Sequence, residues 1–160
     1  MKIRKGTKSD LGDLMQLICE LAEYENAIDK VKIKIKNLEK DGFGKSPLFH
    51  FIVAEVYNQI VGMAVYYNHY STWEGKCLFL EDLIIKKTFR SKGIGSMLFE
   101  KVIEIANKNQ SNRIMWQVLH WNEPAIKFYK KYNATISKEW LNGKLSKDQI
   151  QKFNSKNSFN

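Results

Sequence analysis

The stretch LEDLIIKKTFRSKGIGS, residues 80–96, decides the fold of this chain. It begins as an apolar strand that carries Glu81 and Asp82, and it ends in the pattern Arg-x-x-Gly-x-Gly at the start of a predicted helix. Gly93 and Gly95 let the backbone turn sharply and approach a ligand closely, and the helix directs free N–H groups to the same place. The stretch therefore predicts a phosphate-binding loop between a strand and a helix, with an ordinary glycine turn as the alternative.

The loop differs from two common nucleotide-binding motifs. It is shorter than the Gly-x-Gly-x-x-Gly dinucleotide fingerprint, and it lacks the Gly-Lys-Ser/Thr of a P-loop. NAD and ATP are therefore poor matches, whereas a pyrophosphate attached to another group fits the pattern.

Composition favours one soluble globular domain. The chain has 160 residues, of which 44% are hydrophobic, and no apolar run reaches the roughly 18 residues of a membrane span. We expect one domain over residues 1–153, a disordered polar tail over 154–160, a cytoplasmic location and no membrane binding. Cys19 and Cys77 form no Cys-x-x-Cys and have no paired histidine spacing, which favours reduced thiols and predicts no metal site.

The net charge of +9 raises the possibility of a nucleic-acid partner. The lysines are spread over nearly the whole chain, however, which is typical of a solvated surface and favours no nucleic-acid binding. A positive field of this kind would attract an anionic cofactor such as coenzyme A.

Hydrophobic periodicity and turn residues predict alternating elements around one sheet. Helices are predicted from Thr7 onward, over residues 35–40, from Ile94 onward and from Asn122 to about Tyr132, with Asn133 as a left-handed end. The predicted strands cover residues 2–7, 49–56, 60–67, 76–85, 113–121 and 136–145.

This order of elements resembles the GNAT superfamily of N-acetyltransferases, and five ordered blocks resemble the diamine (spermidine/spermine) N-acetyltransferase family with its thialysine-acetylating branch. The blocks are Glu39 to Gly44 with Pro47, Val53 to Val56, Tyr70 to Trp73, Leu80 to Asp82, and Trp121 to Tyr129. The resemblance implies an α/β (α+β) single-domain GNAT fold, with a mixed central β-sheet flanked by helices.

The resemblance also implies acetyl-CoA as cosubstrate. Backbone groups of the loop would hold the pyrophosphate, the preceding strand would pair with the pantetheine arm and polarise the thioester oxygen, and a later helix would add contacts. The residues assigned to acetyl-CoA are Leu83, Ile84, Ile85, Arg90, Ser91, Lys92, Gly93, Ile94, Gly95, Ser96, Asn122, Glu123, Pro124, Ala125 and Tyr132.

Tyr129 is the predicted general acid, carried over from the Phe-Tyr pair of the family. A phenol with a reference pKa of about 10 is protonated at neutral pH and can give its proton to a departing thiolate. Because Ala125, Tyr129 and Tyr132 share one helical face, packing is the alternative role for this tyrosine.

Glu81 is the predicted base, acting directly or through a water on an ammonium substrate that is almost wholly protonated at pH 7. Strand alternation places Asp82 on the opposite face, as a structural hydrogen-bond acceptor.

Five further positions resemble substrate contacts of the family. Tyr24 and Glu25 end the first helix, and a solvated helix terminus is the alternative for them. Met115, Trp116 and Gln117 would line the groove, although Trp116 also suits a core role.

One position departs from the family pattern. His120 stands directly before the Trp-Asn pair, where family members commonly carry Asp or Glu, so a negative charge is missing there. Its spacing from the other histidines favours a hydrogen-bonding role over metal ligation.

The sequence thus predicts an acetyl-CoA-dependent N-acetyltransferase acting on a diamine or polyamine, with thialysine as the alternative substrate class. A noncatalytic acetyl-CoA-binding protein and a basic nucleic-acid-binding module are the alternatives from other classes. The resemblance further implies a homodimer whose late strands and C-terminal residues help complete each other's groove.

Overall fold

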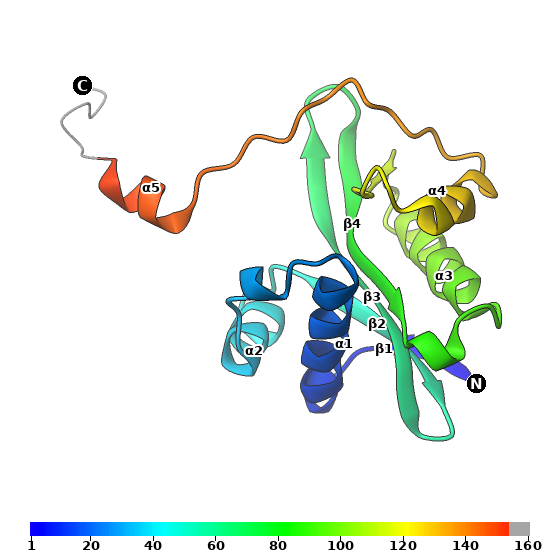
Figure 1. Cartoon of the computed structure of the whole chain (residues 1–160). Coiled ribbons are helices and arrows are strands. Elements are labelled where there is room, and N and C mark those ends of the chain that lie inside the picture. Colours follow the sequence, from blue (N-terminus) through cyan, green and yellow to red (C-terminus); the bar gives the residue numbers. More distant parts are fainter. Residues whose placement is uncertain (154–160) are drawn as a thin grey trace. The chain divides into compact units, whose positions relative to one another are not determined.

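The computed structural model describes residues 1–153 (Figure 1). It divides the chain into two compact units, residues 1–117 and the residues from Val118 onward, and each is described by itself. The disordered tail predicted for residues 154–160 lies outside the described residues.

The first unit is built on a five-stranded sheet in the order β1-β2-β3-β4-β5. Pairing is antiparallel from β1 to β4 and parallel between β4 and β5, which confirms the predicted mixed sheet. Figure 1 shows the long hairpin of β3 and β4 running through this unit. The strands are β1 (Lys2–Lys5), β2 (His50–Val56), β3 (Gln59–Ser71), β4 (Gly75–Ile85) and β5 (Ile114–Met115).

Helices cover both faces of this sheet. The three α-helices of the unit are α1 (Leu11–Tyr24), α2 (Ile35–Phe43) and α3 (Ile94–Lys108), and short 3₁₀ turns η1 (Lys8–Asp10), η2 (Ile28–Lys30) and η3 (Lys87–Phe89) lie between elements. Met63 of β3 belongs to the core cluster that contains Leu14 and Leu17 of α1. A Cβ on neighbouring Gly62 would lie 3.3 Å from Leu98 of α3. Since neighbouring strand residues face opposite sides, α1 and α3 cover opposite faces.

The 3₁₀ turn η1, which leads directly into α1, follows the predicted capping pattern. Thr7 and Asp10 form a capping box, in which the Thr7 N–H donates to an Asp10 carboxylate oxygen at 2.7 Å. Arg4 on β1 binds both oxygens of Asp10 at 2.7 and 2.9 Å. The same guanidinium binds Glu55 of β2 at 2.7 Å, so one arginine joins the helix start to two strands.

The turn between β2 and β3 is confirmed as a tight hairpin. Tyr57 and Asn58 both have positive φ, 48° and 62°, which is the backbone of a type I′ turn. Tyr57 is 99% exposed, so no packing offsets the strain of an aromatic residue in the left-handed region.

The second unit contains α4 (Glu123–Lys130) and α5 (Lys147–Lys152). Asn133 follows α4 with a φ of 57°, as its predicted role as a left-handed end requires. The strand predicted over residues 136–145 is wrong, because these residues have no strand pairing among the described residues. The capping box of Ser146 with Gln149 begins α5 and was a usable sequence signal for it.

The strand predicted over residues 113–121 is also shorter than expected. Only Ile114 and Met115 pair with β4, opposite Leu78 and Phe79. The apolar sequence continues beyond Met115, but residues 116–119 are irregular.

Candidate active site

The centre of the candidate site is an irregularity in β4. Val65 of β3 pairs with Asp82, and the next residue, Tyr66, pairs with Leu80. Glu81 therefore has no opposite residue, which makes it the extra residue of a β-bulge.

The bulge turns Glu81 and Asp82 toward the same face of the sheet. Ile84, two residues after Asp82, belongs to the core cluster under α1, which places Asp82 on the α1 face. Tyr67 lies on that face as well, two residues after Val65 of the same cluster, and burial together with the negative charge of nearby Glu81 raises the pKa of its phenol. The prediction that Asp82 points to the opposite face is thus wrong, because the extra residue interrupts the alternation on which it rested.

A third carboxylate, Glu25, joins this pair from the end of α1. Burial first, and then the negative charges of Glu81 and Glu25, together raise the pKa of Asp82 to about 7. Burial also raises the pKa of Glu25. We call Glu25, Glu81 and Asp82 the carboxylate cluster; a cation of suitable shape would relieve its mutual repulsion.

The outer edge of β4 is open beside this cluster. Within the described residues, β5 pairs with β4 only as far as Phe79, so no strand covers that edge at residues 83–85. Backbone groups on such an edge can pair with an extended ligand. This is the position that the sequence assigned to the pantetheine arm.

The loop over residues 90–96 has the backbone geometry of an anion site. Ser91 and Gly93 are left-handed, with φ of 59° and 80°. Gly93 precedes the first turn of α3, and this left-handed then right-handed order converges successive N–H groups into a concave nest. The first helical hydrogen bond of α3 runs from Met97 N–H to Gly93 O at 3.1 Å, which leaves the preceding N–H groups without an intrahelical acceptor.

The loop's fit to a pyrophosphate rests on the backbone and on nearby charge. Apart from its two chain neighbours, no atom of the described residues lies within 4 Å of a Cβ built on Gly93, so the position needs glycine for its φ and leaves space beside the loop. Lys92 adds a positive charge, with its Nζ 5.2 Å from the centre of the Phe89 ring. These features suit a diphosphate group of the kind that CoA carries.

The guanidinium of Arg90 contacts two protein groups. Its Nε donates to the carbonyl oxygen of Ile85 at 2.9 Å, and its Cζ lies 5.1 Å from the centre of the Tyr24 ring. The loop, the end of β4 and the end of α1 are thereby joined. The sequence analysis assigned Arg90 to the cofactor. No sequence pattern indicated that Arg90 would contact Tyr24.

The remaining groove candidates of the first unit lie on or just after β5. Met115 and Trp116 are half-buried and Gln117 is exposed. The Trp116 ring packs edge-to-face on Phe99 of α3, with ring centres 5.6 Å apart. This contact suits the core role that the sequence left open for Trp116, and its role in the groove stays a prediction.

The second unit holds the predicted acid and the later cofactor residues. Asn122 begins α4, and its side-chain oxygen accepts from the Ala125 N–H at 3.3 Å, as the predicted cap requires. Tyr129 is 7% exposed, and its ring lies 5.1 Å from that of Phe128. Tyr132 is half-buried and also contacts Phe128, with ring centres 5.6 Å apart. Three more residues are exposed: His120 in the preceding turn, and Glu123 and Pro124 in the first turn of α4.

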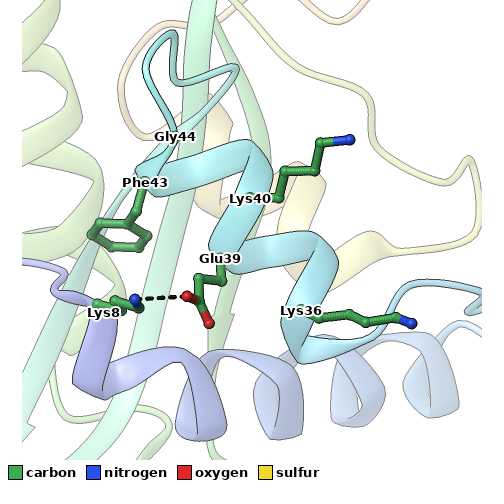
Figure 2. A pocket seen from close by; sticks show the side chains of 6 residues that line it. All are labelled: Lys8, Lys36, Glu39, Lys40, Phe43 and Gly44. Carbon is green, nitrogen blue, oxygen red and sulfur yellow. Dashed lines mark ion pairs between the residues drawn. The ribbon is translucent and has the colours of Figure 1, made fainter.

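A separate pocket of about 370 Å³ lies against α2 (Figure 2). Figure 2 shows Lys8 facing Glu39, to which it is ion-paired at 2.6 Å, while Lys36 and Lys40 extend away from the pair. Phe43 and Gly44 complete the lining. These are surface lysines around one ion pair, and the pocket shares no residue with β4 or the loop.

None of the helices in residues 1–153 is long and apolar enough to cross a membrane. Over the same residues, no group of three or more His, Cys, Asp or Glu side chains is arranged to hold a metal ion.

Solved structures share the fold of this chain. An integron cassette protein from the mobile metagenome of V. cholerae matches with a TM-score of 0.77 and 24% identity, over 94% of this chain and 95% of that one. An aminoglycoside acetyltransferase from an uncultured soil metagenomic sample matches with a TM-score of 0.75 and 20% identity, over 91% of this chain and 95% of that one.

Sequence comparison gives nearer relatives. Thialysine N-epsilon-acetyltransferase of Bos taurus is 40% identical over 140 residues, which cover 82% of this chain and 82% of that protein. Spermidine/spermine N(1)-acetyltransferase-like protein 1 of Homo sapiens is 35% identical over 140 residues, which cover 83% of this chain and 20% of that protein. The profile of the Acetyltransferase (GNAT) family matches residues 13–134, and the chain therefore belongs to the GNAT acetyltransferase family.

Proposed function

We propose that this acetyltransferase moves an acetyl group from acetyl-CoA to a primary amine of a small cationic substrate, a diamine or polyamine of the spermidine or spermine kind. The observation that carries the proposal is the carboxylate cluster. Three carboxylates gather on one face of the sheet, and a loop suited to a diphosphate follows the same strand. A cationic acceptor and an anionic donor would thus each find opposite charge.

The cluster suits an ammonium group for two reasons. An alkylammonium has a reference pKa near 10.4, so the enzyme must bind a cation and then remove a proton from it. Glu81 is our base, acting directly or through a water, and the phenol of Tyr67 lies near its carboxylate. Asp82 and Glu25 supply further negative charge around the cation.

The transfer needs a proton at its end as well as the removal of one at its start. The lone pair of the amine nitrogen forms a bond to the acetyl carbon, and the carbon–sulfur bond breaks with its electron pair on sulfur. We assign Tyr129 as the acid that protonates this thiolate. The nitrogen loses two protons in all: Glu81 takes the first from the ammonium and passes it to solvent, and the second leaves to solvent after the carbon–nitrogen bond has formed. Tyr129 gives one proton to the thiolate and regains it from solvent, so the whole reaction releases one proton.

The donor would be held mainly by backbone groups. The N–H groups of residues 91–96 would bind the diphosphate, with Lys92 adding charge, and the open edge at residues 83–85 would pair with the pantetheine arm. An N–H on that edge would polarise the thioester oxygen. We assign contacts of α4, through Asn122 to Ala125 and Tyr132, to the same cofactor.

Thialysine is the second candidate acceptor. Relatives at 39% and 40% identity are named thialysine N-epsilon-acetyltransferases, whereas the relative named for spermidine and spermine is 35% identical. Both acceptors present a primary amine, but an amino acid also carries a carboxylate, which the carboxylate cluster would repel. The cluster therefore favours the acceptor without a carboxylate.

Release of free CoA from acetyl-CoA tests the proposal, measured with spermidine, spermine, putrescine, thialysine and lysine at equal concentration. We expect amine-dependent release that is highest with a diamine or polyamine. Higher kcat/KM with thialysine would select the alternative acceptor. Binding of acetyl-CoA without turnover on any amine would contradict the proposal and indicate a noncatalytic acetyl-CoA-binding protein.

We also propose that the active form is a homodimer. The extended segment of the second unit exposes two large apolar side chains, Trp140 at 78% and Leu141 at 96%. An irregular apolar segment of this kind can gain strand pairing and burial from a second copy. Sedimentation should give about twice 18.7 kDa, and a fully active strict monomer would contradict a shared groove.

A further inference from the structure

Arg90 connects two parts of the first unit that would bind different substrates. It belongs to the loop that suits a diphosphate, yet its Nε donates to Ile85 O at 2.9 Å and its Cζ lies 5.1 Å from the Tyr24 ring centre. Tyr24 is the last residue of α1 and directly precedes Glu25 of the carboxylate cluster. The guanidinium therefore lies between the end of β4 and the end of α1.

Backbone hydrogen bonds close the end of α1, from Asn26 N–H to Glu23 O at 3.0 Å and from Ala27 N–H to Ala22 O at 2.7 Å. Glu25 is its C-cap, with its N–H bonded to Leu21 O at 3.0 Å, and Asn26 then leaves the helix with a φ of 55°. A contact on the Tyr24 ring acts on this last turn of the helix, next to Glu25, whose negative charge reaches Asp82.

We infer that Arg90 is a positioning residue for the amine: it holds the Tyr24–Glu25 end of α1 against the end of β4 and so fixes the acceptor side of the carboxylate cluster. This inference rests on the proposed amine acetyltransferase function. The loop's backbone N–H groups remain in place without the arginine side chain, so its loss should weaken amine use more than acetyl-CoA use.

Arginine suits this position better than lysine. Its planar guanidinium can stack on an aromatic ring while one N–H donates to a carbonyl oxygen in the same plane, whereas an ammonium group offers a point charge without that plane. Arg90→Lys should therefore keep the charge and restore only part of the effect.

The test compares Arg90→Met with Lys92→Met, since each removes one positive charge from the loop. Lys92 contacts the Phe89 ring within its own loop. Arg90→Met should raise the amine KM about two- to fivefold, the range expected for loss of a partly exposed cation–π contact. Lys92→Met should act on the acetyl-CoA KM instead, and Arg90→Lys should lie between wild type and Arg90→Met for the amine.

A double-mutant cycle on amine KM isolates the contact. Tyr24→Leu should raise amine KM in the wild type but add little in the Arg90→Met background, while Tyr24→Phe, which keeps the ring, should retain the coupling. Thermal unfolding of each variant checks that it folds. If Arg90→Met does not fold, the cycle is measured with Arg90→Lys and Tyr24→Leu instead.

The possible outcomes distinguish a failure of this inference from a failure of the proposed amine acetyltransferase function. If the wild-type enzyme turned over no amine, the result would contradict the proposed function itself. An active wild type in which Arg90→Met changes only the acetyl-CoA KM, with additive effects of Tyr24→Leu, would overturn the positioning role and leave the function standing.

Discussion

Replacing Asp82 with Asn should stabilise the protein at pH 8 while weakening amine use. The pKa of Asp82 rises from its ordinary value of 3.8 to about 7, first through burial and then through the charges of Glu81 and Glu25. Above pH 4 the unfolded chain therefore loses this proton while the folded protein retains it. Stability consequently falls as pH rises from about 4 to about 7.

The two pKa values set the size of the effect. Their difference corresponds to about 4 kcal/mol as an upper bound, since one pH unit is about 1.4 kcal/mol. Water can reach the half-buried carboxyl and its neighbours can relax, so we expect about 2 to 3 kcal/mol. Asparagine has nearly the same shape as aspartic acid and cannot ionise, so the variant does not lose stability as pH rises.

Urea unfolding of wild type and Asp82→Asn at pH 4.5 and at pH 8 measures the effect. The variant should gain stability over wild type mainly at pH 8, and effects common to both proteins cancel in the difference. Glu23→Gln, which neutralises an exposed carboxylate near the same end of α1, is the matched control and should change little. A difference that is the same at both pH values would refute the reasoning about Asp82.

Three further predictions concern backbone strain and the start of α1. Gly93→Val should lower thermal stability and raise the acetyl-CoA KM, because valine is strained at a φ of 80°; Gly93→Asn should be milder, and equal effects would contradict this cause. Asp10→Asn should cost about 2 to 4 kcal/mol at pH 7, because the Arg4 hydrogen bonds hold the pKa of that carboxyl well below its usual range. That stabilisation is present above pH 4 and lost as pH falls further, so urea unfolding should show the two proteins converging in acid. Tyr57→Asn should gain about 0.5 to 1 kcal/mol, because asparagine tolerates the left-handed turn; an unchanged melting temperature would contradict the strain.

Local sequence signals predicted the elements that local interactions fix. Thr7 and Asp10 carry a capping box, a short turn was expected at Tyr57 and Asn58, and Gly93 precedes an amphipathic helix. Each of these depends on residues a few positions apart, so the sequence contains the whole interaction. The order of helices and the mixed sheet followed from them and from the family resemblance.

Interactions between distant segments could not be predicted in this way. The face of Asp82 depends on an extra residue in the pairing of β4 with β3, and period-two alternation has no signal for it. The contact of Arg90 with Tyr24 depends on the approach of α1 to the end of β4. Residues 136–145 resembled a strand, but the described chain has no strand in this range.

The kcat of Tyr129→Phe tests direct acetyl transfer with a tyrosine acid most directly. The substitution keeps the ring beside Phe128 and deletes only the hydroxyl. We expect kcat to fall about 10²-fold or more, with little change in either KM and with normal acetyl-CoA binding. A folded Tyr129→Phe enzyme with near wild-type kcat would contradict the account, because the thiolate would then take its proton from another group.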